Sequence, residues 1–183
     1  MKFMLGFVAA ILLAIIGGVA VIYGGAYNVA ADEDHSRIVK WILGAAMTNS
    51  VKSRAGAAPP PAGLDAEDHV RAGFHLFDEM CVQCHGAPGK KRGEIGLGLR
   101  PEPPGLSEVA RRWTTAQLFW IVKHGIATTG MPAFGGTHTQ EQLWDLVAFV
   151  QKLPGLSPEQ YKALEQGAGA PHEHGPHEHQ HGH

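Results

Sequence analysis

The sequence predicts an all-α domain of helices and long loops behind an N-terminal transmembrane helix. Three observations lead to this fold class. One apolar segment near the N-terminus is long enough to span a bilayer. Four later segments carry apolar side chains at helical spacing, and no segment alternates apolar and polar residues as a strand would. The 24 glycines and 12 prolines among 183 residues indicate long loops between the helices.

Composition excludes two classes of protein. Apolar residues make up 44% of the chain, which is too many for a disordered protein. The formal net charge of −2 predicts no general attraction to nucleic acid or to acidic surfaces. The length allows one modest domain with additional segments at its ends.

Residues 1–23 are predicted to be a transmembrane anchor. Phe3 to Ile22 are almost all apolar, and about 20 helical residues span the core of a bilayer. A cleavable signal peptide is the alternative, because Val29-Ala30-Ala31 fits a cleavage site. Lys2 is the only charge on the N-terminal side, so the positive-inside rule places the N-terminus in the cytoplasm. Both alternatives export the rest of the chain.

Residues 24–63 are predicted to hold an amphipathic helix and a Pro/Ala linker. The helix covers residues 34–54, with Asp34 or Ser36 as its N-cap. The linker is "AGAAPPPAG" at 55–63. The helix fits either a position on the membrane surface or packing on the globular domain or a partner subunit. Its apolar stripe consists of Ile38, Trp41, Ile42, Ala45, Met47 and Val51.

Residues 64–156 are predicted to form the globular domain around three helices. The first covers 65–80, with Asp65 as N-cap. The second covers 114–126, with Thr114 or Thr115 as cap. The third covers 139–153, with a capping box. Their predicted core side chains are Val70, Phe74, Phe77, Leu118, Ile121, Val122, Leu143, Leu146, Val147 and Val150. So thin a core is typical of a domain stabilised by a metal, a disulfide or a cofactor.

Both cysteines of the chain lie in the stretch "MCVQCHG" at 80–86. A zinc knuckle would need two further ligands at suitable spacing, and a thioredoxin-type redox pair would need a preceding strand. Cys-x-x-Cys-His is instead the attachment signature of c-type haem. Each thiol forms a thioether with one haem vinyl group, and the histidine ligates the iron. The motif predicts one covalent haem c held by Cys81, Cys84 and His85.

A second axial ligand is predicted in the loop "TTGMPAFGG" at 128–136. Met131 is the only methionine after the cysteine motif, and Pro132 stiffens the backbone beside it. Ligation by imidazole and thioether leaves no open site on the iron and raises its potential. The competing ligands are four histidines that we expect at the surface, namely His69, His75, His124 and His138.

With these motifs the chain resembles the monohaem class I cytochromes c, of the bacterial membrane-anchored type. The resemblance covers residues 64–156. It rests on Gly73 and Phe77, on "CVQCHG", on "GLRPEPPGL", on the loop around Met131 and on "LWDLVAFVQKLP". It implies the class I cytochrome c fold, in which Gly73 lets the first and last helices cross closely. It also implies aromatic positions for Trp144 and Phe149, and a proline near the proximal histidine, either Pro103 or Pro104.

The resemblance implies electron transfer by a carrier, not an enzyme, on the periplasmic side of the bacterial inner membrane. The expected partners are redox proteins such as a terminal oxidase or a dehydrogenase, and no nucleic acid. Arg100 and Trp113 are candidate partners for the haem propionates. The alternatives are a haem enzyme or gas sensor with an open iron site, or a metal-handling protein.

Residues 157–183 are predicted to form a short helix and a disordered His-rich tail. The tail interleaves histidines with Glu173 and Glu178, and imidazoles beside carboxylates suit divalent copper, nickel and zinc. A solvated tail without a ligand is the alternative. Its histidines are His172, His174, His177, His179, His181 and His183.

Overall fold

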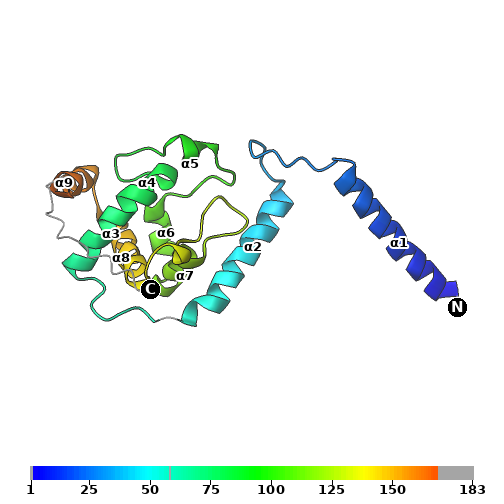
Figure 1. The fold of residues 1–183 in the computed structure, drawn as a ribbon, viewed down its shortest axis with the longest axis horizontal. Helices are drawn as coiled ribbons and strands as arrows, with labels where there is room; N and C mark the ends of the chain where they lie inside the picture. Colours follow the sequence, from blue (N-terminus) through cyan, green and yellow to red (C-terminus); the bar gives the residue numbers. More distant parts are fainter. Residues whose placement is uncertain (1, 58, 169–183) are drawn as a thin grey trace, which may run out of the picture. The chain divides into compact units, whose positions relative to one another are not determined.

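The computed structural model describes residues 2–57 and 59–168, and its course is drawn in Figure 1. The chain divides into two compact units, Met1–Glu33 and Asp34–His183. The predicted His-rich tail lies outside the described residues.

The first unit contains helix α1, Lys2–Tyr23. Its segment Phe3–Tyr23 has a mean hydropathy of 2.8, and none of the side chains in the apolar window is buried by protein. Within the described part of the chain, α1 is the one helix long and apolar enough to cross a membrane. It fits the predicted membrane anchor.

The second unit is built from helices and loops. Its α-helices are α2 Arg37–Arg54, α3 Glu67–Met80, α4 Val82–His85, α5 Glu94–Gly98, α6 Leu106–Arg112, α7 Thr115–His124, α8 Gln140–Lys152 and α9 Pro158–Ala168. Three short 3₁₀ helices are η1 Ala55–Ala57, η2 Phe134–Gly136 and η3 Leu153–Gly155. Residues 2–57 and 59–168 contain no strand. Within them, Ala87 and Lys90 form one isolated antiparallel bridge. The all-α prediction is confirmed.

Three of the four helices with a predicted N-cap begin at a predicted residue. Ser36 caps α2, and Thr114 and Thr139 form capping boxes at α7 and α8. The prediction of Asp65 as N-cap of α3 is wrong. The N-cap is Ala66, which has no side-chain hydrogen-bond acceptor, and its N–H donates to the Gly63 carbonyl in a turn. Asp65 therefore lies one residue too early.

The centre of the domain is the crossing of α3 and α8, which lie side by side (Figure 1). Gly73 is buried at the crossing, and a Cβ atom added there would lie 1.9 Å from the Asp145 carbonyl oxygen. Only a residue without a side chain allows this approach. The α8 side chains from Leu143 to Val150 are all buried, including the four predicted ones.

Aromatic rings fill the core around this crossing. Phe149 lies 5.1 Å from Phe77 and 5.3 Å from Phe74, measured between ring centroids, and Trp144 stacks on Phe119 at 3.8 Å. Helix α9 contributes Tyr161 to the same cluster, and this side chain is only 1% exposed. The packed core therefore includes residues after Leu156.

A second, smaller cluster joins α2 to α7. Val51 of α2 and Ala55 of η1 are buried against Ile121, and Met47 and Met131 pack at the edge of the cluster. The C-terminal half of α2 is thus part of the packed unit, which agrees with the domain-packing alternative for this helix.

Candidate haem-binding site

The Cys-x-x-Cys-His motif folds as one helical turn directly after α3. The His85 N–H donates to the Cys81 carbonyl at 2.9 Å, and the Cys84 N–H lies 3.2 Å from the same oxygen. Both cysteines are free thiols and are half-buried. Cys81 packs against the main core cluster, so the turn is attached to the crossing of α3 and α8.

One ring nitrogen of His85 is occupied by the backbone. His85 Nδ1 lies 2.8 Å from the Pro104 carbonyl oxygen, so Nδ1–H donates to it and the neutral ring presents Nε2 as its lone-pair nitrogen. Such a bond fixes the tautomer and orientation of a ligating histidine. Of the two prolines predicted near this histidine, Pro104 makes the hydrogen bond.

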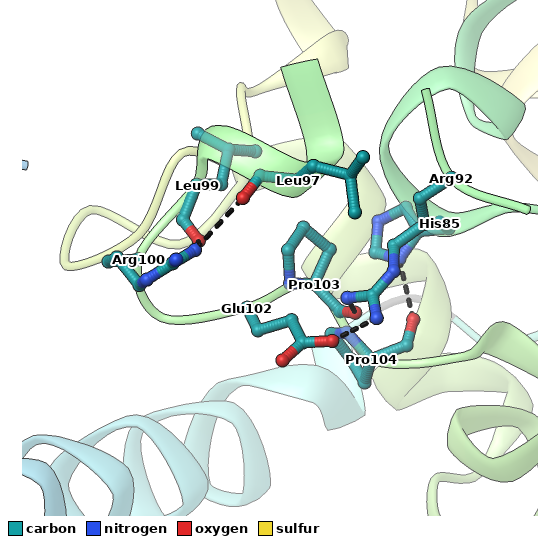
Figure 2. A network of polar contacts seen from close by, with 8 residues as sticks. All are labelled: His85, Arg92, Leu97, Leu99, Arg100, Glu102, Pro103 and Pro104. Atoms are coloured by element: carbon teal, nitrogen blue, oxygen red, sulfur yellow. Dashed lines mark hydrogen bonds and ion pairs between the residues drawn. The ribbon is translucent and has the colours of Figure 1, made fainter. Parts of the chain in front are cut away.

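An arginine holds the segment that carries this carbonyl. Figure 2 shows Arg92 between Glu102 and Pro103, beside His85. Arg92 Nη1 donates to the Pro103 carbonyl at 2.9 Å, and Nη2 forms an ion pair with Glu102. Two consecutive backbone carbonyls, of Pro103 and Pro104, are therefore directed at Arg92 and His85 respectively.

Segment 94–101 connects the histidine side of the site with the methionine loop. A Cβ added at Gly96 would lie 2.6 Å from the Cys84 carbonyl oxygen, so α5 packs directly on the cysteine turn. Three residues later, the Leu99 side chain contacts Gly130, next to Met131. Arg100 donates from Nη1 to the carbonyls of Leu97 and Leu99, at 3.0 and 2.9 Å (Figure 2).

The loop around Met131 is closed by its own hydrogen bonds. The Ile126 N–H donates to the Met131 carbonyl at 3.2 Å, and the Met131 N–H donates to Thr129 Oγ1 at 3.1 Å. Gly125 starts the loop with a φ of +64°, and a Cβ there would lie 2.7 Å from the Pro132 carbonyl. The backbone N–H and the carbonyl of Met131 are thus both held by hydrogen bonds.

Trp113 links the two halves of the site. It packs against the main cluster, which Cys81 touches, and against the second cluster, which includes Met131. Its role toward a haem propionate stays a prediction, as does that of Arg100.

Burial shapes the electrostatics of the cysteine turn. Burial, together with the neighbouring Cys84, raises the pKa of the Cys81 thiol to about 12. Burial lowers the pKa of His85, and the charge of Arg92 acts in the same direction, whereas the hydrogen bond to Pro104 opposes them. The apolar surroundings that cause both shifts suit a large apolar ligand.

The residues present fit a haem c. Two thiols share one turn, His85 keeps Nε2 for a metal, and the apolar side chains of Ile95 and Leu97 are 64% and 61% exposed on α5, which packs on the turn. Among the described residues, no group of three or more His, Cys, Asp or Glu side chains could hold a bare metal ion. The cysteine turn therefore suits a prosthetic group bound through two thioethers and one imidazole.

Comparison with known families decides what this unit is. Residues 68–150 match the model of the family described as cytochrome C oxidase, cbb3-type, subunit III. This segment is a class I cytochrome c domain. The match includes both crossing helices, the cysteine turn and the Met131 loop, whereas α2 and α9 lie outside it. No curated protein matches the chain.

A cytochrome c domain carries haem c and transfers electrons, which is the coarse function predicted from the motif. Sequence reasoning missed two contributors to the site in this cytochrome. Nothing in the sequence marks the contact between Arg92 and the 102–103 backbone. The second is the packing of α2 beside Met131. The apolar stripe of α2 was the one sequence signal for it, and that stripe fitted a membrane surface equally well.

The alternative histidine ligands have other neighbours in the cytochrome. His69 Nδ1 lies 2.6 Å from Asp145 Oδ1, and His138 Nδ1 lies 2.8 Å from Thr137 Oγ1. The His124 ring lies 4.9 Å from the Trp120 ring, and the His75 ring lies 5.8 Å from that of Phe74.

Proposed function

We propose that the chain is a membrane-tethered electron carrier with one haem c, attached to Cys81 and Cys84 and ligated by His85 and Met131. The observation that carries the proposal is the cysteine turn with His85 held at Nδ1 by the Pro104 carbonyl. The bound haem supplies a one-electron iron couple. The protein's own residues fix the ligands, so that little rearranges when the charge on the iron changes.

The hydrogen bonds of the site support this rigidity. The Pro104 carbonyl orients the imidazole, and Arg92 restrains the preceding carbonyl and Glu102. On the other side, Thr129 and Ile126 restrain the backbone of Met131. An iron held by both His85 and Met131 would have no open site, which would suit a carrier and not an enzyme or a gas sensor.

The proposed organisation places the carrier outside the bacterial inner membrane. Residues 1–23 form the anchor, 24–63 connect it, 64–156 form the cytochrome domain, and 157–183 follow it. Lys2 as the only N-terminal flanking charge supports an exported domain. The matched family is described as an oxidase subunit, which supports a terminal oxidase complex as the electron-exchange partner. The His-rich tail is proposed to bind a divalent metal independently of the haem.

The test is Met131→Leu in the full-length holoprotein. Leucine preserves the side-chain volume but offers no thioether to the iron. We expect the oxidised protein to lose its sulfur-to-iron charge-transfer band, the reduction potential to fall and the reduced iron to bind carbon monoxide. Optical spectroscopy and redox titration measure all three.

Met47→Leu is the matched control, because Met47 belongs to the same apolar cluster as Met131 but lies on α2. We expect it to leave spectrum and potential unchanged. A Met131→Leu protein that stays low-spin at the wild-type potential would show that another residue, such as one of the four histidines, is the ligand. A wild-type protein that binds carbon monoxide promptly would instead favour the open-site alternative.

A further inference from the structure

The exposure of α2 changes sharply along its length. Near its start, Ile38 and Trp41 are 70% and 73% exposed and Ile42 is 49% exposed. Near its end Val51 is 1% exposed, and Ala55, which follows α2 as the first residue of η1, is 5% exposed. The three exposed residues stand at i, i+3 and i+4 and therefore share one face of the helix. We call residues 37–42 the α2 tip.

The docked half of α2 fixes the direction of the tip. Val51 and Ala55 pack with Ile121 of α7, and Met47 and Met131 border the same cluster. The tip thus cannot cover its apolar face by rotating onto the domain without taking Val51 out of the core. Some other surface must cover Ile38, Trp41 and Ile42 if they are to leave water.

The charges on the tip suit a lipid surface. Arg37 begins the helix, and Lys40 lies on the side of the helix away from the apolar face, where its Nζ pairs with Asp34 at 2.9 Å. A helix with a tryptophan and two isoleucines on one face and cations on the other sides is typical of a membrane interface. Tryptophan itself is enriched at that depth.

The covalent connection sets an upper limit on the distance between the tip and the end of α1. Residues 24–36 separate the end of α1 at Tyr23 from the start of α2. Even fully extended at about 3.5 Å per residue, a linker of this length reaches only ~45 Å. Two further exposed apolar side chains, Tyr27 and Val29, lie in this connection.

We propose that the α2 tip binds the surface of the membrane that α1 spans, with Trp41 and Ile38 inserted at the boundary between head groups and acyl chains. The proposal rests on α1 being retained as an anchor, and it goes beyond electron transfer. Since the other half of α2 packs beside Met131, a bound tip would hold the methionine side of the cytochrome at a defined distance from the bilayer.

The test is photo-crosslinking in vesicles of phosphatidylethanolamine and phosphatidylglycerol. The full-length holoprotein is prepared with p-benzoylphenylalanine replacing Trp41 in the tip, Ile15 in α1 or Lys162 on α9. All three positions are exposed in the protein, so none of the substitutions disturbs the core. After irradiation, mass spectrometry of the peptides identifies what each position contacts.

We expect lipid adducts at positions 15 and 41 and none above background at position 162. Adducts at 15 without adducts at 41 would overturn the proposal while leaving the anchor and the carrier function intact. Equal adducts at 41 and 162, or a crosslink from 41 to a second copy of the chain, would overturn it too. Absence of adducts at 15 would show that α1 is not inserted, which removes the premise and the proposal together.

Discussion

Single residues without large side chains decide how closely this molecule packs. Gly73 is the clearest case, since the Asp145 carbonyl occupies the place of its missing Cβ. The sequence alone showed Gly73 only as a glycine inside a helix, and its role came from the family resemblance. Helical propensity would favour alanine there, by about 1 kcal/mol.

Gly73→Ala should therefore destabilise the domain, although alanine has the higher helix propensity. We expect a loss of roughly 1–3 kcal/mol or more in the free energy of unfolding, because α3 and α8 must separate to admit a methyl group. Denaturant unfolding of the holoprotein measures it. Gly44→Ala is the control, because nothing lies within 4 Å of a Cβ at that mid-helix position of α2. Equal stability of the two variants would contradict the close contact of α3 with α8 at Gly73.

Arg92 acts at the same scale, through the backbone beside His85. Arg92→Lys keeps the charge but loses the planar fork that reaches Pro103 and Glu102 together. We expect the hydrogen bond from His85 Nδ1 to Pro104 to open more often, so that the Nδ1 proton exchanges faster with water in NMR spectra. Arg71→Lys, which alters an exposed pair with Glu67, should leave this exchange rate unchanged. Equal rates in wild type and the Arg92 variant would contradict the role.

Among the elements, the long helices were predictable and the short ones were not. Capping residues and apolar stripes predict α7 and α8 within residues 114–126 and 139–153, and the structure confirms both helices. Helices α5 and α6 have only 5 and 7 residues, which is too short for a periodic pattern. They are stabilised by contacts with distant parts of the chain, such as Gly96 against Cys84.

The element that most extends the predicted domain is α9. Tyr161 is buried among the rings of Phe74, Phe77 and Phe149, and its hydroxyl donates to Asp78 Oδ1 at 2.8 Å. Tyr161→Ala should lower the free energy of unfolding by about 3–5 kcal/mol, the usual range for removing a large buried aromatic side chain. Tyr161→Phe keeps the ring and should cost about 1.5–3 kcal/mol, since it removes only the hydrogen bond to a carboxylate.

The same residue makes stability depend on alkaline pH. Burial, with the hydrogen bond to Asp78, raises the pKa of Tyr161 above its ordinary value of 10.0. The folded state therefore keeps the proton that the unfolded state loses, and stability is full below pH 10 and falls as the pH rises beyond it. Tyr161→Phe should flatten this fall, as measured by denaturant unfolding at several pH values. If Tyr161→Phe leaves the decrease of stability with pH unchanged, other groups cause that decrease.

The whole molecule combines a helix long and apolar enough to cross a membrane with a cytochrome c domain. Local patterns were enough to predict both the membrane anchor and the haem attachment site. The first rests on 20 apolar residues and the second on a five-residue motif. The choice between a docked and a membrane-bound α2 could not be predicted in this way, because one apolar stripe fits both surfaces. The structure shows that Val51 is buried against the domain and that Trp41 is exposed; contact of the exposed half with a membrane is our proposal.

For the intact chain we expect fractionation with membranes and resistance to extraction by salt or carbonate. A fragment beginning at Asp34 should be released by salt, since it lacks α1 but keeps the docked half of α2. Immunoblotting of membrane and soluble fractions measures both. Mass spectrometry that finds a native N-terminus at Asp32 would show instead that the segment is a cleaved signal peptide.

The hydrogen bonds of the cytochrome also span very different lengths of chain, which bears on the order of assembly. The cysteine turn closes within five residues, the bond from His85 to Pro104 spans 19 positions, and the pair of His69 with Asp145 spans 76. Short loops close at a smaller entropic cost than long ones. In a chain emerging from its N-terminus, both thiols can therefore take up their paired geometry before α8 exists to shut the core, so that attachment of the prosthetic group can precede folding.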